Sequence, residues 1–345
     1  MKTLPAPRTA DPRRAPSLRW AVLGPGVIAD QFATVLRART GQQLLAVGSR
    51  SIARATRFAE RHGIPKAYGD YAQTVADPEV DVVYIAVPAH EHLNLALLAI
   101  HAGKHVLVEK PFARNAAEAR TMVAAAREAN VSLMEAMWMR FLPGTDVVRQ
   151  VLASGELGDI QLVTCDHGHK VPRTGRLYDP TAAGGALLDI GVYGFSFANL
   201  VLGEPSSICA VGTRTDNGLD AQEVVTLSEF PSHPGALAVL SSSMIVQTPG
   251  AASVCGSAGR LEIPADFYRP EAIRFVDSHG SSVTWTGPTE TPYQGLGHEI
   301  SHFATIVADG LPESPWMTHD ESVTIMGQMD AVRALLEQSF TSEPP

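Results

Sequence analysis

The chain has few cysteines, no surplus of positive charge and no long apolar run. Its three cysteines, Cys165, Cys209 and Cys255, are odd in number and widely spaced, which argues against a disulfide framework and favours a reducing compartment. The 27 Lys and Arg residues are outnumbered by 36 Asp and Glu residues, and the net charge of −9 argues against nucleic acid as a partner. No apolar run approaches the ~20 residues of a membrane span, so we expect no membrane-spanning segment.

With 345 residues, 45% of them hydrophobic and 18% charged, the chain can bury more than one core, and we expect two domains. Residues 1–17 are rich in Pro, Arg and small side chains and predict a disordered tail. Arg13-Arg14 invites comparison with a twin-arginine export signal, but the apolar segment that follows is the first predicted strand. We therefore predict a cytoplasmic protein.

In the stretch that starts at Leu18, a short apolar run ends in a glycine-rich turn at Gly24. Gly-x-Gly-x-x-Ala follows at Gly24, Gly26 and Ala29, and apolar residues then recur at helical spacing over 27–36. A strand, a glycine turn and a helix in this order are typical of dinucleotide binding, because the second glycine lets the backbone approach a pyrophosphate at the helix N-terminus. The alternative is an ordinary turn between a strand and a helix. The predicted cofactor-binding residues here are Gly24, Gly26, Val27 and Ile28.

Strands and helices alternate up to residue 140. Apolar runs predict further strands, and helical spacing predicts the helices between them. The strands are expected at 43–48, 80–87, 104–109 and 131–134, and the helices at 51–62, 91–101 and 115–129. This alternation implies right-handed βαβ units. We therefore predict that residues 18–140 form a dinucleotide-binding Rossmann domain with a doubly wound parallel sheet.

After residue 141 the predicted strands follow one another, which argues for antiparallel pairing. They are expected near 159–168, 206–214, 221–230, 236–246, 251–256, 272–277 and 281–286, with helices near 145–154, 189–202, 295–309 and 319–338. We predict that residues 141–345 form an α+β domain with a large, mostly antiparallel open sheet that binds substrate. Because such a sheet leaves one apolar face uncovered, we expect a homodimer or homotetramer joined through this domain.

The end of the second strand indicates the cofactor type. An NAD-binding domain usually has an acidic residue there to bond the ribose hydroxyl, whereas this chain has Ser49-Arg50. A hydroxyl followed by a guanidinium suits a 2′-phosphate, so we predict NADP and consider NAD less favoured. The carboxyl ends of later strands, where doubly wound folds bind ligands, add further predicted cofactor contacts. These are Pro88, His90, His92, Glu109 and Lys110.

Two sets of residues are candidates for catalysis. Lys110 lies at the carboxyl end of a parallel strand, where its ammonium can hold a substrate hydroxyl. Asp189 and Tyr193 are four residues apart, so on a helix they share one face, and a carboxylate beside a phenol suits proton transfer. The alternatives are a surface lysine, a helix N-cap at Asp189 and a half-buried aromatic at Tyr193.

A third pattern argues for zinc but is weak. His298-Glu299-Ile300-Ser301-His302 matches H-E-x-x-H, with Glu321 downstream as a candidate third ligand. A chain with 12 histidines can match this pattern by chance, and a zinc peptidase would leave the nucleotide-binding half unexplained. We therefore predict no metal. His167 and His169 alternate too closely to pair on one helix face.

Together these motifs resemble the Gfo/Idh/MocA family of oxidoreductases from Arg19 onward. The matching segments are residues 24–29, 87–92, 102–111 and 184–193. The resemblance implies a Rossmann domain followed by an α/β domain whose open sheet forms subunit contacts. It also implies that Lys110 is the catalytic lysine, often with a cis bond to Pro111.

Many members of this family have His at the position of Tyr193. Tyr there, together with residues 134–141, is most similar to the dihydrodiol dehydrogenase and NADP-dependent xylose dehydrogenase branch. The resemblance predicts an enzyme that transfers hydride between NADP(H) and a secondary alcohol of a sugar, polyol or cyclic diol. In this role Tyr193 transfers the hydroxyl proton, Lys110 stabilises the alkoxide, and Asp189 orients the substrate.

The residues expected to line the substrate side are Trp138, Arg140, Arg176 and Tyr178. Two other functions stay open at this point. Some members of the family reduce nucleotide-linked keto-sugars, and members without the catalytic pair act as NADP-binding sensors. The presence of both Lys110 and Tyr193 argues against the sensor.

Overall fold

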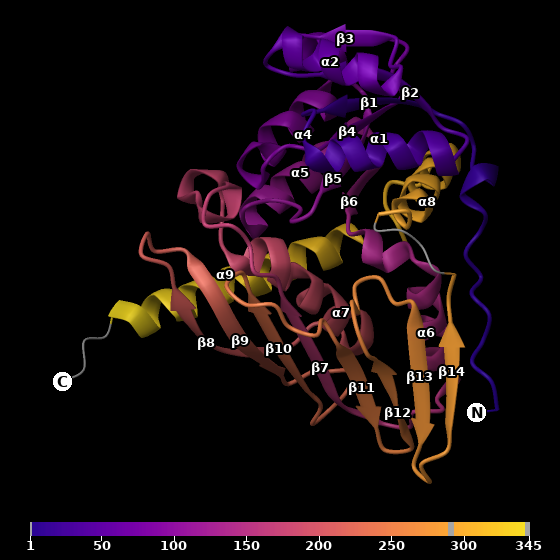
Figure 1. Ribbon diagram of the computed structural model, residues 1–345, viewed down its shortest axis with the longest axis vertical. Coiled ribbons are helices and arrows are strands. Elements are labelled where there is room, and N and C mark those ends of the chain that lie inside the picture. The colour runs from indigo at the N-terminus through magenta and orange to yellow at the C-terminus, as the bar shows by residue number, and fades with distance from the viewer. Residues whose placement is uncertain (1, 289–292, 342–345) are drawn as a thin grey trace. The chain divides into compact units, whose positions relative to one another are not determined.

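The computed structural model describes residues 2–288 and 293–341 of the chain. These residues form two compact units, each with its own sheet (Figure 1). Of the described residues, the parallel-sheet unit comprises 9–141 and 293–323, and the open-sheet unit comprises 2–8, 142–288 and 324–341. The C-terminal residues of the chain are thus shared between both units, whereas the sequence predicted a single boundary near residue 140.

The parallel-sheet unit has six strands in the order β3-β2-β1-β4-β5-β6, all paired in parallel. They are β1 (Arg19–Leu23), β2 (Gln43–Gly48), β3 (Lys66–Tyr68), β4 (Val82–Ile85), β5 (His105–Glu109) and β6 (Leu133–Ala136). The helices are α1 (Val27–Arg39), α2 (Ile52–His62), α3 (Tyr71–Val75), α4 (His92–His101), α5 (Ala116–Ala129) and α8 (Leu296–Ala308). The strand order reverses between β1 and β4, which is where doubly wound folds bind their ligands.

The core of this unit lies on both faces of the parallel sheet. Trp20 on β1 is fully buried, and its ring packs 5.7 Å from Phe32 of α1 and 6.0 Å from Phe303 of α8. The indole Nε1 donates to Gln42 Oε1 at 3.0 Å, so its polar atom is satisfied. Helix α8 therefore belongs with α1, although it follows the second sheet in the sequence, because its apolar side completes this core.

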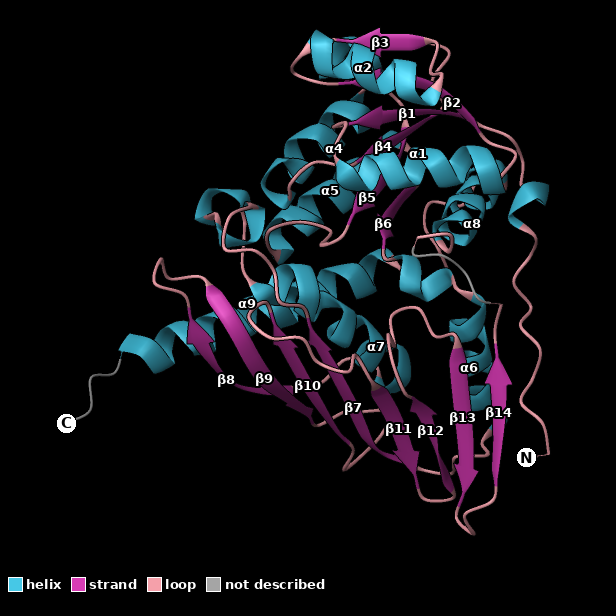
Figure 2. Ribbon diagram, in the orientation of Figure 1, coloured by secondary structure: helices cyan, strands magenta, loops and turns pink. Residues whose placement is uncertain are grey.

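The open-sheet unit contains an eight-stranded sheet in the order β14-β13-β12-β11-β7-β10-β9-β8 (Figure 2). Among the described residues, only β7 and β10 pair in parallel. The strands are β7 (Ile160–Gly168), β8 (Ser207–Arg214), β9 (Asp220–Ser228), β10 (Leu237–Ser243), β11 (Ala252–Gly256), β12 (Gly259–Ile263), β13 (Ala272–Asp277) and β14 (Ser282–Thr286). Helices α6 (Pro143–Ser154) and α7 (Val192–Leu202) pack on one face, and α9 (His319–Thr341) continues into this unit from residue 324. The predicted combination of a parallel and a mostly antiparallel sheet is confirmed.

Three short elements were not predicted from the sequence: β3, α3 and β12. Each has three to five residues, which is too short to show a hydrophobic period. The N-terminal segment also differs from the expected disordered tail. A helical turn at Pro12–Arg14 is capped by Asp11, and Arg8 forms an ion pair with Asp146 of α6 at 3.0 Å. These contacts give the segment defined partners.

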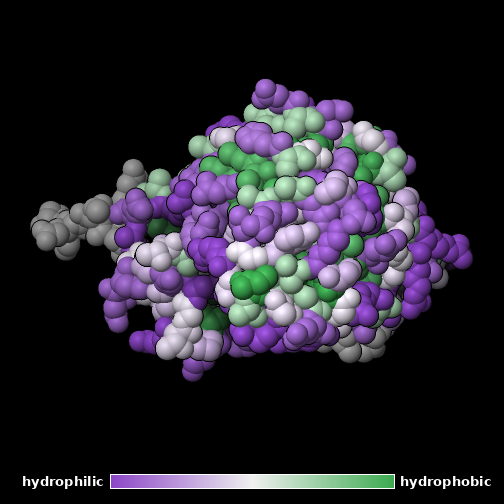
Figure 3. Space-filling view, turned by 90° about the horizontal axis from the view of Figure 1, so that it is seen from above, coloured by the Kyte–Doolittle hydropathy of each residue, from purple (hydrophilic) through white to green (hydrophobic). Residues whose placement is uncertain are grey.

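One helical stretch, Pro180–Leu202, is long and apolar enough by composition to cross a membrane, which was not expected from the sequence. However, 89% of its most apolar window is buried inside the protein, as in the core helix of a soluble fold. On the face of the molecule shown in Figure 3, apolar side chains occur in small patches between hydrophilic ones.

The uncovered face of the eight-stranded sheet carries exposed apolar side chains. Val211 on β8 lies opposite Val224 on β9, which in turn lies opposite Ser241 on β10. Leu237 is four residues before Ser241 on β10, so its side chain lies on the same face of the sheet. The three apolar residues are 68%, 44% and 43% exposed, respectively. Together, Val211, Val224 and Leu237 form what we call the valine patch.

Candidate active site

The glycine turn after β1 has the geometry of a phosphate-binding loop. Gly24 has φ +90°, and a Cβ atom there would lie 2.5 Å from Val87 Cγ1 and 2.9 Å from Ala86 O, so only glycine fits. Above Gly26 a Cβ would meet nothing closer than 3.9 Å. Gly26 is the N-cap of α1 and makes no side-chain cap, so the first N–H groups of the helix face this open space.

A cavity of about 450 Å³ adjoins this turn and is rich in arginine. Arg54 Nη2 lies 3.5 Å from Pro25 O, and Arg61 forms an ion pair with Asp30 at 2.7 Å. The cofactor contacts predicted from the sequence include Ser49 and Arg50 but none of the three arginines at positions 54, 57 and 61, although these have the spacing of one helix face. The lining residues are Pro25, Gly26, Val27, Asp30, Arg54, Arg57, Phe58 and Arg61.

Ser49 and Arg50 lie at the carboxyl end of β2, as predicted. Ser49 is buried, and its Oγ accepts from the Ser51 N–H at 3.2 Å. The Arg50 side chain is 76% exposed and forms an ion pair with Glu91 at 3.3 Å. The guanidinium is therefore held near the loop after β4 but remains accessible to a ligand.

The two histidines after β4 differ in their surroundings. His92 is almost fully buried, with Nδ1 3.0 Å from Pro111 O and Nε2 2.8 Å from Val87 O. It therefore links the loops that follow β4 and β5, and both ring nitrogens face backbone carbonyls rather than a ligand. His90 is partly exposed, and its Nε2 lies 3.7 Å from Glu91.

The loop that carries Lys110 is held between two carboxylates. Glu109 accepts from Tyr84 Oη and, through Oε2, from the Lys110 N–H at 3.2 Å. Glu135 accepts from the Phe112 N–H at 3.1 Å. The Lys110–Pro111 bond is cis, as the family resemblance implied. Glu109 therefore shapes the backbone of the loop. The sequence analysis predicted only a cofactor contact for this residue.

Two buried carboxyl groups lie in the same core. Burial raises the pKa of Glu135 to about 7, although Ser322 and the Phe112 N–H favour its ionised form. Burial also raises the pKa of Glu299, and the charges of Glu109 and Glu135 act in the same direction. Both groups are therefore easier to protonate than an ordinary glutamate.

The H-E-x-x-H residues lie on α8. Burial lowers the pKa of His298 to about 4, and His302 Nε2 lies 2.8 Å from Ser314 Oγ with its ring stacked on Trp316. Within residues 2–288 and 293–341 no group of three or more His, Cys, Asp or Glu side chains has a metal-binding arrangement.

In the open-sheet unit, Asp189 and Tyr193 lie on a continuous helical stretch. Asp189 belongs to a π-helical segment, Leu187–Gly191, that continues into α7 at Val192. The Asp189 carboxylate pairs with Arg176 at 2.5 Å, so the predicted N-cap alternative does not describe it. Tyr193 is buried, with the His167 ring 5.2 Å and the Tyr268 ring 5.4 Å from its own ring centre. Burial and the Asp266 charge raise the pKa of Tyr268 to about 12.

The four residues predicted to line the substrate side have different environments. Arg176 and Tyr178 lie on a short helical turn of the open-sheet unit, and Tyr178 packs partly buried beside Ala186 and Ile190. Trp138 is buried, with its ring 6.2 Å from that of Tyr293.

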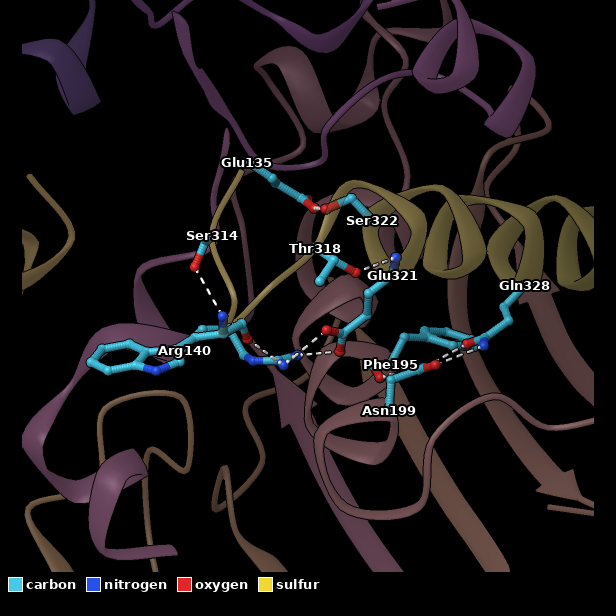
Figure 4. Close-up of polar contacts among 10 residues, drawn as sticks. Glu135, Arg140, Phe195, Asn199, Ser314, Thr318, Glu321, Ser322 and Gln328 are labelled. Atoms are coloured by element: carbon cyan, nitrogen blue, oxygen red, sulfur yellow. Dashed lines mark hydrogen bonds and ion pairs between the residues drawn. The ribbon is translucent and has the colours of Figure 1, made fainter. Parts of the chain in front are cut away.

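Arg140 does not fit a substrate contact. Its side chain is 3% exposed, and its Nη1 and Nη2 donate to Glu321 at 2.6 and 3.1 Å (Figure 4). Nη2 also donates to Trp316 O at 2.7 Å. The buried ion pair holds the guanidinium against the first turn of α9. The predicted substrate role of Arg140 is therefore corrected to a structural one.

Comparison with known proteins identifies both halves of the chain. A model of an oxidoreductase family with an NAD-binding Rossmann fold (GFO_IDH_MocA) matches residues 18–137, and a GFO/IDH/MocA C-terminal domain model matches residues 145–262. The chain is 36% identical over 335 residues to trans-1,2-dihydrobenzene-1,2-diol dehydrogenase of Sus scrofa, covering 95% of this chain and 99% of the relative. The enzyme of Homo sapiens with the same name is 35% identical over 334 residues, with the same coverage.

A solved structure is also similar to this chain over nearly its whole length. The 3-ketoreductase KijD10 of Actinomadura kijaniata, in complex with TDP-benzene and NADP, matches with a TM-score of 0.79 and 28% identity, over 93% of this chain and 98% of that chain. The predicted family and the predicted dihydrodiol dehydrogenase branch are both confirmed by these matches. The chain belongs to the Gfo/Idh/MocA family of oxidoreductases, with an NAD-binding Rossmann fold in its parallel-sheet unit.

Proposed function

We propose that the protein is an NADP(H)-dependent dehydrogenase that oxidises a secondary alcohol of a cyclic diol, sugar or polyol, or reduces the matching ketone. The single observation that carries this proposal is the 36% identity, over almost the whole of both chains, to a dihydrodiol dehydrogenase. In the oxidative direction the substrate loses a hydride and a hydroxyl proton. The hydride acceptor would be supplied by C4 of a bound nicotinamide.

The glycine turn and the arginines beside it would hold the cofactor. The open space above Gly26 and the uncapped start of α1 suit the pyrophosphate. Arg50 and Arg54 suit a 2′-phosphate, because a guanidinium binds phosphate with two parallel hydrogen bonds. Ser49 stands where an NAD-binding domain usually has an acidic residue, so no carboxylate would repel that phosphate. These residues support a preference for NADP over NAD.

Three residues would act on the substrate. Tyr193 exchanges the proton with the substrate hydroxyl through its Oη. The Lys110 ammonium stabilises the negative charge that develops on the substrate oxygen. Asp189, held by Arg176, accepts a hydrogen bond from a neighbouring substrate hydroxyl and so orients the ring. Trp138, Tyr178 and Arg176 remain the proposed substrate-lining residues.

The second candidate function is reduction of a nucleotide-linked keto-sugar. The similarity to KijD10, a 3-ketoreductase bound to a TDP compound, favours it, but at 28% rather than 36% identity. The non-catalytic NADP-binding sensor is a third candidate. Turnover of free diols or sugars, of nucleotide-linked sugars, or of neither separates the three.

The test is a substrate panel read by NADPH absorbance. Aromatic cis and trans diols, aldoses, inositols and a TDP-linked keto-sugar are assayed with both cofactors. On the best substrate, Tyr193→Phe should lower kcat by about 100-fold or more, and Lys110→Met by at least as much, with NADPH affinity unchanged. Turnover by Tyr193→Phe within threefold of the parent contradicts the proposed proton transfer, and His90 would then be tested next. A cytoplasmic location is also proposed and is tested by cell fractionation.

A further inference from the structure

The π-helical segment before Tyr193 is held by a carboxylate that has no part in the proposed chemistry. Asp220 lies at the start of β9, and its Oδ2 accepts from the Leu187 N–H at 2.6 Å. The backbone N–H of Ala186 also bonds to this carboxylate. Asp220 therefore binds the first N–H groups of the segment that leads to Asp189.

The backbone in front of this segment is built around the same carboxylate. Gly185 has φ +113°, and a Cβ atom there would lie 2.2 Å from Asp220 Oδ1. Any other residue would meet both a rare backbone conformation and a carboxylate oxygen. The close approach of Gly185 lets Asp220 reach the N–H groups of Ala186 and Leu187.

Two further contacts hold the other end of the segment. His167 Nδ1 on β7 lies 3.0 Å from Ile190 O. At Gly191 a Cβ would lie 2.8 Å from Ser242 Oγ and 3.2 Å from Glu223 Oε1, so the backbone packs directly on β10 and β9. The segment is thus fixed along its length by groups from three strands.

We propose that Asp220 is a positioning residue for catalysis, acting through the π-helical segment to place Tyr193. The proposal rests on the proposed function, because it assigns Tyr193 the proton transfer. π-helical turns interrupt the regular α-helical hydrogen-bond ladder and are common at functional sites. Here the first N–H groups of the turn bond to Asp220 from outside the helix. A carboxylate supplies acceptors for several N–H groups at once, and an amide of the same shape offers only one oxygen.

The test is a double-mutant cycle of Asp220→Asn with Tyr193→Phe in the full-length protein. We expect Asp220→Asn to lower kcat on the best alcohol by about tenfold or more, with NADPH affinity unchanged. In the Tyr193→Phe background the same change should lower kcat by less than about twofold, because the residue it positions no longer transfers a proton. Asp216→Asn, an exposed acid in the turn before β9, is the matched control and should behave as the parent.

Several outcomes would overturn the role of Asp220. One is a parent-like kcat in Asp220→Asn. Another is a tenfold loss that Asp220→Asn also causes in the Tyr193→Phe background, because such a loss indicates general damage to the fold. If Asp220→Asn does not fold, Gly185→Ala displaces the same carboxylate from the opposite side and should show the same non-additive loss. A normal kcat in Tyr193→Phe alone instead contradicts the proposed function, so the two failures are distinguishable.

Discussion

Nη2 of Arg176 lies 2.5 Å from Oδ1 of Asp189, so the carboxylate proposed to orient the substrate is paired with a cation from the preceding loop. The Asp189 side chain is 18% exposed and that of Arg176 is 47% exposed. The pair is therefore open enough for a ligand to reach and for solvent to weaken it.

Removal of this cation should weaken substrate binding rather than cofactor binding. We expect Arg176→Ala to raise the KM for the alcohol by about five- to tenfold, because a partly exposed ion pair contributes about 1 kcal/mol. The Kd for NADPH should stay unchanged. Arg173→Ala, an exposed arginine on the same loop, is the control. An unchanged KM in Arg176→Ala would show that the pair does not serve the substrate.

Cofactor selectivity should depend on the arginines beside the glycine turn. NADPH should bind at least ~10-fold more tightly than NADH, a difference of about 1.4 kcal/mol. Arg50→Ala should remove most of this preference by weakening NADPH alone, and Arg54→Ala should act in the same direction. Fluorescence titration with both cofactors measures this, with Arg120→Ala on the exposed side of α5 as the control. Equal affinities in the parent protein would contradict the assignment of this strand end.

The valine patch should join subunits. Its three apolar residues are exposed on the uncovered face of the eight-stranded sheet, which is costly for a monomer in water. Light scattering at micromolar concentration should give two or four times 36.8 kDa, and Val224→Arg should shift the mass toward 36.8 kDa. Leu311→Arg, an exposed apolar residue in the parallel-sheet unit, should leave the mass unchanged. A parent protein of 36.8 kDa would rule out this interface.

Stability should fall between pH 4.5 and 7 because of Glu135. Its pKa is about 7 in the folded protein against an ordinary value of 4.5, so the folded state binds the proton more tightly than the unfolded state. The stabilisation is complete below pH 4.5 and is lost as the pH rises to about 7. By linkage it amounts to up to about 3 kcal/mol.

Urea unfolding at pH 5 and pH 7.5 checks this contribution. The decrease in unfolding free energy between the two values should be smaller in Glu135→Gln than in the parent. Glu128→Gln, on the exposed side of α5, should keep the parent's decrease. An equal decrease in Glu135→Gln would show that Glu135 is ionised throughout this range.

Local patterns were enough to predict most of the fold. The strand–turn–helix at residues 19–36 is determined by residues that are close in sequence. Gly24 permits the turn, and the spacing of the apolar side chains that follow it favours the helix. The same holds for the alternation that produces the parallel sheet, where each strand is a continuous apolar run. The glycine turn after β1 and the place of Lys110 at a strand end could therefore be predicted from residue spacing alone.

Partners distant in sequence could not be predicted in this way. Arg140 was predicted to contact the substrate. In the structure it forms a buried ion pair with Glu321, which lies 181 residues away in the sequence. His92 likewise bonds Pro111 O, 19 residues along the chain. Whether a polar side chain faces a ligand or a backbone carbonyl depends on what packs against it, and no local pattern records that.

The sequence by itself determined the two kinds of sheet and the residue types that can carry the chemistry, because these follow from spacing along the chain, and its motifs indicated the family by resemblance. Only the tertiary structure decided that α8 completes the core around Trp20, that three arginines line the cavity beside Gly26, and that Asp220 holds the segment before Tyr193. The physical reason is that burial and hydrogen bonding satisfy groups in space. A polar side chain takes whichever partner the folded chain brings within about 3 Å, at any distance along the sequence.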